Sequence, residues 1–118
     1  MEGRKSVLVI EDTLLVRECL CYALKSDGFK VRGCEDGASA LDVAAENDFH
    51  VIITDYRMPN MNGVDATKHL RIRFPASIII GVSSDDKRAD FLAAGADAFL
   101  LKPYRYGELL NLMSAKRQ

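Results

Sequence analysis

The sequence has 118 residues, of which 48% are hydrophobic and 28% charged, a balance typical of one globular domain with a single core. Sixteen Lys and Arg residues against seventeen Asp and Glu give a net charge of −1, which argues against direct nucleic-acid binding because no basic surface is supplied. No apolar stretch is long enough to span a bilayer, so we expect a cytoplasmic protein without a membrane partner.

The chain begins with a strand and helix pair. Residues 7–10 are a short apolar run, typical of a strand buried on both faces. Apolar side chains then recur every three or four positions from 16 to 24, which predicts a helix, and Gly28 is placed to end it. Residues 30–34 alternate polar with apolar side chains, as expected of a strand at the border of a sheet.

The middle of the chain continues the alternation. Asp36 is in position to cap a helix whose apolar stripe lies at 41–45. Residues 51–53 form a second apolar run, and a helical pattern of apolar side chains follows from 66 to 74. These segments predict a buried central strand with a helix on each side of it in sequence.

The last third of the chain contains two further pairs. Residues 78–80 and 98–101 are apolar runs that predict strands, and a helical pattern at 89–93 separates them. Gly95 is placed to end that helix. A final helix is predicted from the apolar residues at 109–113.

Five strand and helix pairs in regular alternation predict an α/β fold. Right-handed crossovers return each helix to the sheet, so the strands run parallel and helices cover both faces. We expect a flavodoxin-like (βα)5 three-layer sandwich with strand order 2-1-3-4-5, formed by one domain at 1–118.

Two other groups of residues have ordinary explanations. A basic segment on the third predicted helix is expected to be a solvated face, and the cysteines, which lack metal-finger spacing, are expected to be reduced packing thiols. The basic residues are Lys68, His69, Arg71 and Arg73, and the cysteines are Cys19, Cys21 and Cys34.

Reactive side chains follow the predicted strands. In an open α/β sheet, ligands bind beyond the carboxyl ends of the strands, so residues at those ends are expected to converge. In chain order they are Glu11 and Asp12, Asp55, Ser83 and Ser84, and Lys102 with Pro103.

Three carboxylates at one edge require a positive charge between them. Like charges about 5 Å apart repel by about 3 kcal/mol at an effective dielectric of about 20. A hard dication with oxygen ligands relieves this repulsion, and Mg²⁺ is the expected ion, with Mn²⁺ as a substitute. Asp12 on its own could instead cap the next helix, and Lys102 could be an ordinary surface lysine.

Four sequence fragments together resemble the CheY-like receiver domains of bacterial two-component response regulators, and the resemblance covers the whole chain. The fragments occur in the order of that family: VLVIED at 7–12, DYRMPNMNG at 55–63, GVSS at 81–84 and AGADAFLLKPY at 94–104.

The resemblance implies a role for each matching residue. Asp55 is the expected phosphorylated nucleophile, and Lys102 and Ser83 are expected to contact the phosphoryl group. The implied metal ligands are Asp12, Asp55 and the backbone carbonyl of Arg57, with Glu11 acting through water. The chain would then catalyse only its own phosphorylation and slow dephosphorylation.

The resemblance also implies switch, modulating and structural roles for residues around the site. Ser83 and Phe99 are the expected conformational switch, although Phe99 could be a plain packing residue. Ser84 and Arg57 flank the site and are expected to modulate the lifetime of the phosphorylated form: Ser84 could hinder or position the attacking water, and Arg57 could shield the phosphoryl group or merely extend into solvent. Pro59, Gly63 and Pro103 are expected to be structural, and the Lys102-Pro103 bond could be cis or trans. The fourth helix should be shorter than is common in the family.

The implied partners are a sensor histidine kinase or a histidine phosphotransfer protein, and a downstream protein or an effector domain outside this sequence. A phosphorylation-dependent homodimer is a further option.

Three alternatives compete with this interpretation. A flavin carrier needs a phosphate-binding first loop, which Glu11 and Asp12 would repel. A haloacid-dehalogenase-type phosphatase expects a second Asp two residues after the first, where Arg57 stands. A degenerate receiver that acts as a phosphorylation-independent interaction module would usually have lost Asp55, Asp12 or Lys102, all of which are present.

Overall fold

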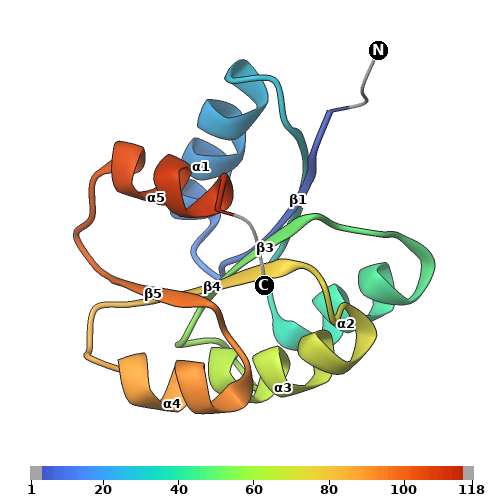
Figure 1. Ribbon diagram of the computed structural model, residues 1–118, viewed down its shortest axis with the longest axis vertical. Coiled ribbons are helices and arrows are strands. Elements are labelled where there is room, and N and C mark those ends of the chain that lie inside the picture. The colour runs from blue at the N-terminus through green and yellow to red at the C-terminus, as the bar shows by residue number, and fades with distance from the viewer. Residues whose placement is uncertain (1–3, 116–118) are drawn as a thin grey trace.

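The computed structural model describes residues 4–115 and shows five strands alternating with five helices (Figure 1). The strands are β1 (Ser6–Ile10), β2 (Lys30–Cys34), β3 (Val51–Asp55), β4 (Ile78–Ser83) and β5 (Ala98–Leu101). The helices are α1 (Leu14–Ser26), α2 (Gly37–Glu46), α3 (Gly63–Arg73), α4 (Arg88–Ala94) and α5 (Tyr106–Met113). The predicted alternation is therefore confirmed.

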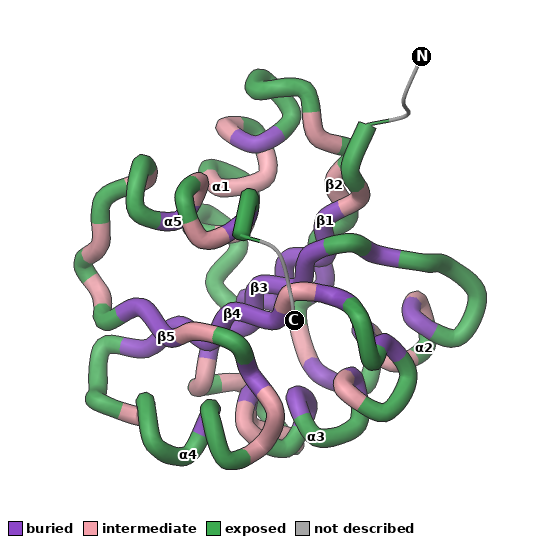
Figure 2. Tube along the Cα trace, viewed as in Figure 1, coloured by how far each residue is buried: buried purple, intermediate pink, exposed green. Residues whose placement is uncertain are grey.

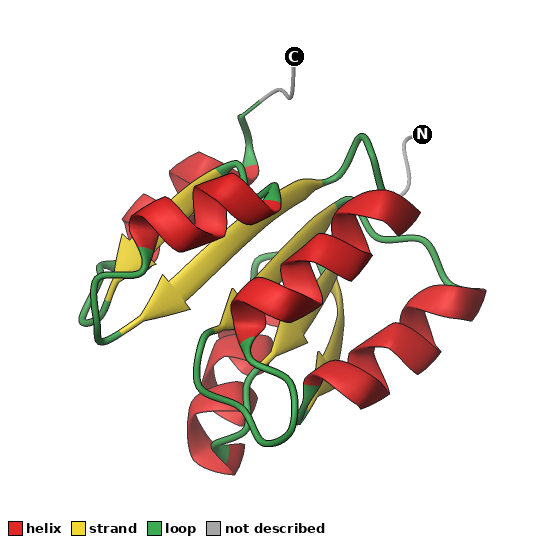
Figure 3. Cartoon of the chain, turned by 90° about the horizontal axis from the view of Figure 1, so that it is seen from below, coloured by secondary structure: helices red, strands yellow, loops and turns green. Residues whose placement is uncertain are grey.

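All five strands are parallel, in the order β2-β1-β3-β4-β5. Helices α1 and α5 cover one face of the sheet, and α2, α3 and α4 cover the other (Figures 1 and 3). The three-layer sandwich and the strand order both agree with the prediction. The order reverses between β1 and β3, which is where an open α/β sheet binds ligands.

The core follows from the apolar runs. β3 is buried along its whole length, β1 is buried at 7–10, and both lie among the buried segments at the centre of Figure 2. β2, at the border of the sheet, buries only Cys34 and leaves its other residues at least partly accessible. The polar alternation of residues 30–34 had indicated this border position.

Local signals set several helix ends. Asp36 caps α2, because its Oδ1 accepts a hydrogen bond of 2.8 Å from the backbone N–H of Ser39. Gly95 ends α4 in the left-handed region, with φ of 114°, a conformation that a residue without Cβ adopts at little cost. Helix α4, expected to be short, has seven residues.

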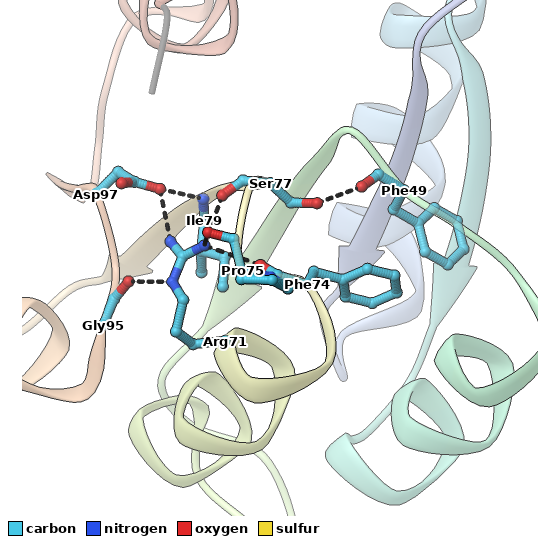
Figure 4. Close-up of polar contacts among 8 residues, drawn as sticks. All are labelled: Phe49, Arg71, Phe74, Pro75, Ser77, Ile79, Gly95 and Asp97. Carbon is cyan, nitrogen blue, oxygen red and sulfur yellow. Dashed lines mark hydrogen bonds and ion pairs between the residues drawn. The ribbon is translucent and has the colours of Figure 1, made fainter. Parts of the chain in front are cut away.

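The basic segment on α3 is exposed at Lys68, His69 and Arg73, as predicted, but Arg71 is not part of a solvated face. The side chain of Arg71 is only 14% exposed, and its guanidinium forms an ion pair of 2.7 Å with Asp97 (Figure 4). The same group donates to the backbone carbonyls of Gly95 at 2.9 Å and Ser77 at 2.7 Å. Arg71 thus joins the end of α3 to the segments that enter β4 and β5.

The cysteine prediction is correct in part. All three cysteines are free thiols; Cys34 is buried and Cys21 is half-buried, as packing thiols should be, but Cys19 is exposed. Within residues 4–115 no helix has both the length and the apolar character needed to cross a membrane.

Candidate functional site

The carboxyl ends of the parallel strands bring acidic and basic side chains to one edge of the sheet. Glu11 follows β1 directly, Asp55 is the last residue of β3, and Lys102 follows β5. Ile10 is paired with Thr54, so the residues that follow them lie side by side. The predicted convergence of strand ends is therefore present.

Three carboxylates form a cluster that suits a cation. Glu11, Asp12 and Asp55 each offer one oxygen, and the three oxygens lie within 4.8 Å of one another. Oδ1 of Asp55 is buried, and its only close donor among the residues that the structure describes is the ammonium of Lys102. Thr13, not Asp12, stands at the N-cap of α1, so Asp12 does not act as the cap of that helix. Clustered anionic oxygens of this kind fit a hard divalent ion.

Lys102 neutralises part of this charge. Its Nζ lies 2.9 Å from Oδ1 of Asp55 and donates a hydrogen bond of 3.1 Å to Oε1 of Glu11. The backbone N–H of Lys102 donates to the carbonyl of Ser83 at 2.8 Å, which attaches the start of this loop to the end of β4. The Lys102-Pro103 peptide bond is cis. Lys102 is therefore a member of the carboxylate cluster and not a free surface lysine.

The charges in the cluster perturb one another. Burial raises the pKa of Glu11, and the charge of Asp55 adds to that rise, against the opposing hydrogen bonds from Thr13 and Lys102. Burial alone would lower the pKa of Lys102, but the hydrogen bonds and charges of Asp55 and Glu11 outweigh it and leave that pKa raised. Three carboxylates against one ammonium leave the site with an excess of negative charge, which a further cation would stabilise.

The family model of the response regulator receiver domain matches residues 7–114. The chain belongs to this family.

Relatives and solved structures agree with this assignment. The chain is 35% identical over 112 residues to the response regulator MprA of Mycobacterium sp. (strain KMS), covering 92% of this chain and 49% of that protein. It thus spans about half the length of that relative. Two solved structures are similar in fold: the chemotaxis protein CheY4 of Vibrio cholerae and TrrA of Thermotoga maritima in complex with Mg²⁺-BeF.

The structural matches extend over nearly the whole chain. For CheY4 the TM-score is 0.86 at 29% identity, with 92% of this chain and 95% of that chain covered. For TrrA the TM-score is 0.83 at 26% identity, with 91% and 94% covered.

In this receiver domain the hydroxyl predicted to contact the phosphoryl group is buried at the site's edge. Ser83 is 2% exposed, and its Oγ accepts a hydrogen bond of 3.1 Å from the backbone N–H of Asp85. The carboxylate of Asp85 is ion-paired with Arg57, which links the loop after β3 to the loop after β4. Ser84 is exposed.

The loop between β3 and α3 is packed more tightly than its turn residues had suggested. Pro59 is exposed, as a turn residue usually is. Gly63 is buried and donates its N–H to the carbonyl of Tyr56 at 2.8 Å. An added Cβ at Gly63 would lie within 3.0 Å of the Asp55 carbonyl, so the absence of a side chain is required there.

Phe99 of the receiver domain is 3% exposed and packs against Phe91 of α4, with ring centroids 5.7 Å apart. The guanidinium of Arg88 lies over the Phe99 ring, 5.4 Å from its centroid. These contacts bury the aromatic residue that was expected to act as a switch, and that role stays a prediction.

Sequence reasoning missed Asp85 and Phe91. Asp85 follows the GVSS fragment closely, but nothing in the sequence predicts its pairing with Arg57, 28 residues away. For Phe91 one signal was available: Gly81 interrupts a strand of branched residues, and a glycine there often marks a close approach by another group.

Proposed function

We propose that Asp55 of this receiver domain accepts a phosphoryl group in an Mg²⁺-dependent reaction, and that phosphorylation alters a downstream output. The observation that carries this proposal is the state of Asp55: its Oδ1 is buried and is paired with the ammonium of Lys102 at 2.9 Å, and no other donor among residues 4–115 reaches it. A carboxylate held in this way keeps an electron pair free to attack an electrophile.

The residues of the site suit in-line phosphoryl transfer. A carboxylate oxygen of Asp55 attacks the phosphorus of a phosphohistidine, the P–N bond breaks, and the imidazole leaves with that bonding pair and takes up a proton from water. The products are an aspartyl phosphate and a free histidine side chain. Such a transfer depends mainly on positioning and on positive charge beside the phosphoryl oxygens.

Lys102 supplies one positive charge, and Ser83 can donate its hydroxyl hydrogen to a phosphoryl oxygen. A bound Mg²⁺ would supply the second charge, held by Asp12, Asp55 and the Arg57 carbonyl, with Glu11 acting through water. The carboxylate cluster supports this ligand set.

Arg57, Ser84 and Asp85 are proposed to set the lifetime of the phosphorylated state. Arg57 now pairs with Asp85, and a phosphoryl group on Asp55 would offer its guanidinium a more highly charged partner. A shift of Arg57 toward the phosphoryl group would cover it and slow attack by water. Ser84, exposed at the same rim, would then be free to position or exclude that water.

The proposed donor is a cytoplasmic histidine kinase or a histidine phosphotransfer protein. We place the receiver domain at 1–118 and the output in a further domain or a separate protein, and a phosphorylation-dependent homodimer is one form that output could take. The span of about half of MprA supports an output beyond these residues. Phe99 and Ser83 are the proposed switch, as in the sequence-based prediction.

Intact-mass spectrometry tests the function directly. The purified domain is incubated with Mg²⁺ and acetyl phosphate, and a mass gain of one phosphoryl group is expected. The gain should be absent with Asp55→Asn or with chelator, and it should be lost at alkaline pH because acyl phosphates hydrolyse there. A wild-type protein that neither binds Mg²⁺ nor gains this mass would overturn the proposal in favour of a phosphorylation-independent interaction module.

A further inference from the structure

Helix α4 is attached to the sheet mainly through one side chain. Phe91 is fully buried, whereas the neighbouring Leu92 is 44% exposed. At its beginning, Lys87 makes no side-chain capping bond, but the carboxylate of Asp86 accepts the N–H of Arg88 at 3.1 Å, and these contacts lie at the surface. The other end is held at Gly95, whose carbonyl accepts from Arg71 at 2.9 Å. Phe91 therefore fixes how the first part of α4 lies on the sheet.

The ring of Phe91 occupies a slot left by two glycines. A Cβ added to Gly81 of β4 would lie within 3.0 Å of the ring at Cγ, Cδ1 and Cδ2. A Cβ added to Gly63 of α3 would lie 3.1 Å from Cζ, at the tip of the same ring. The base of the ring thus rests over β4, and its tip reaches the beginning of α3.

The tip of the ring lies against residues that adjoin Asp55. Gly63 is packed on the Asp55 carbonyl so closely that no side chain fits between them. The ring of Tyr56, the residue after Asp55, meets the Phe91 ring edge to face, with centroids 6.3 Å apart. The carbonyl of Tyr56 in turn accepts the N–H of Gly63 at 2.8 Å. Phe91 thus touches the loop 56–63 at both of its ends.

We propose that Phe91 is a positioning residue for the carboxylate site. Its ring holds the loop 56–63 through Gly63 and Tyr56, and so sets where Asp55 and the Arg57 carbonyl meet Mg²⁺. Coupling of this kind is reciprocal, so filling the site should also hold α4 more firmly. This inference rests on the proposed function and names a residue that the family resemblance did not assign.

The test separates positioning from general core packing. Phe91→Leu keeps the branched base of the side chain over Gly81 and removes the tip that reaches Gly63. Leu109→Ala is the matched control, because Leu109 is also fully buried but belongs to the core cluster on the opposite face. Urea unfolding compares the stability of the two variants, and Phe91→Met serves if Phe91→Leu does not fold.

Two measurements have defined outcomes. Calorimetric titration should show that Phe91→Leu binds Mg²⁺ roughly three- to tenfold more weakly than the wild type, with Leu109→Ala unchanged. Hydrogen exchange in metal-free protein should be faster at 56–63 in Phe91→Leu only. In the wild type, Mg²⁺ with beryllium fluoride should slow exchange in α4.

Wild-type affinity and exchange in Phe91→Leu, or equal losses in Leu109→Ala, would overturn the positioning role. A wild type that fails to bind Mg²⁺ refutes the proposed function instead. If the wild type does not bind Mg²⁺, hydrogen exchange at 56–63 in the metal-free protein still tests whether Phe91 holds the loop. Failure of the proposed function and failure of the positioning role are therefore distinguishable.

Discussion

The ammonium of Lys102 donates a hydrogen bond of 3.1 Å to Glu11, a residue 91 positions earlier in the sequence. The same ammonium lies 2.9 Å from Asp55, so one cation serves two buried carboxylates. An amine in this place both stabilises the fold and competes with any metal ion for the same oxygens.

Replacing Lys102 should therefore have opposite effects on stability and metal binding. Lys102→Met leaves Glu11 and Asp55 without their cation and should lower the free energy of unfolding by about 1–3 kcal/mol. Mg²⁺ should bind roughly three- to tenfold more tightly, because the competing charge is gone. Urea unfolding and calorimetric titration measure the two effects, with the exposed Lys68→Met as control. Weaker Mg²⁺ binding by Lys102→Met would contradict this account.

The ionised carboxylate of Glu11 should lower the free energy of unfolding at neutral pH. Its raised pKa means that the ionised form is less favourable in the folded than in the unfolded protein, where the ordinary value is 4.5. Glu11→Gln should therefore be more stable at neutral pH, by on the order of 1 kcal/mol, and should bind Mg²⁺ more weakly. As the pH falls through the raised value, the wild type takes up a proton and the difference in stability should shrink. Urea unfolding across this range checks the sign, and a wild type that is more stable at neutral pH would refute it.

Arg71 should be hard to replace even by lysine. Its guanidinium reaches Gly95, Ser77 and Asp97 at once, which the single ammonium of a lysine cannot do. Arg71→Lys is expected to lower the free energy of unfolding by about 1–3 kcal/mol, since partly buried carbonyls lose their donors. Arg73→Lys, at a side chain 41% exposed, is the control and should cost less. Equal losses in urea unfolding would show that the Arg71 contacts contribute little.

The link between α5 and the end of α1 should weaken at alkaline pH. The hydroxyl of Tyr106 donates to Asp27 at 2.7 Å. Burial, then the hydrogen bond and charge of Asp27, raise the pKa of Tyr106 to about 12 from an ordinary value of 10.0. The stabilisation should be complete below pH 10 and lost as the pH rises through about 12.

Urea unfolding of Tyr106→Phe isolates this contribution. The variant should be less stable by about 0.5–1 kcal/mol near neutral pH and should match the wild type in strong alkali. Tyr22→Phe, at a residue 76% exposed, is the control. A stability difference that does not change with pH would mean that the hydroxyl acts through packing alone.

The fold was predictable because its signals are local. Each strand is an apolar or alternating run, and Asp36 and Gly95 mark helix ends by their own chemistry. The site was predictable for a related reason. Parallel strands end at one edge of the sheet, so the residues that follow them lie close together however many residues separate them in the sequence. Asp55 and Lys102 could thus be placed together from sequence.

Contacts between distant segments were not predictable. From its sequence position, Arg71 was expected to be a surface cation on α3. Only the structure shows that its guanidinium donates to the carbonyl of Gly95, 24 residues later. Likewise, Gly63 was expected to be an ordinary turn residue, but a glycine is required there because position 63 lies so close to the Asp55 carbonyl that a Cβ would not fit. Such features depend on which groups meet across the fold, and residue type and spacing do not specify that.

The Arg71 network lies where β4 and β5 begin, whereas the carboxylates lie where β1 and β3 end. The residues that could bind a ligand and the Arg71 contacts that support the fold therefore lie at opposite rims of one sheet. Substitutions in the loops at the carboxylate edge leave the supporting rim untouched, so this scaffold can change what it binds while its thermal tolerance changes little.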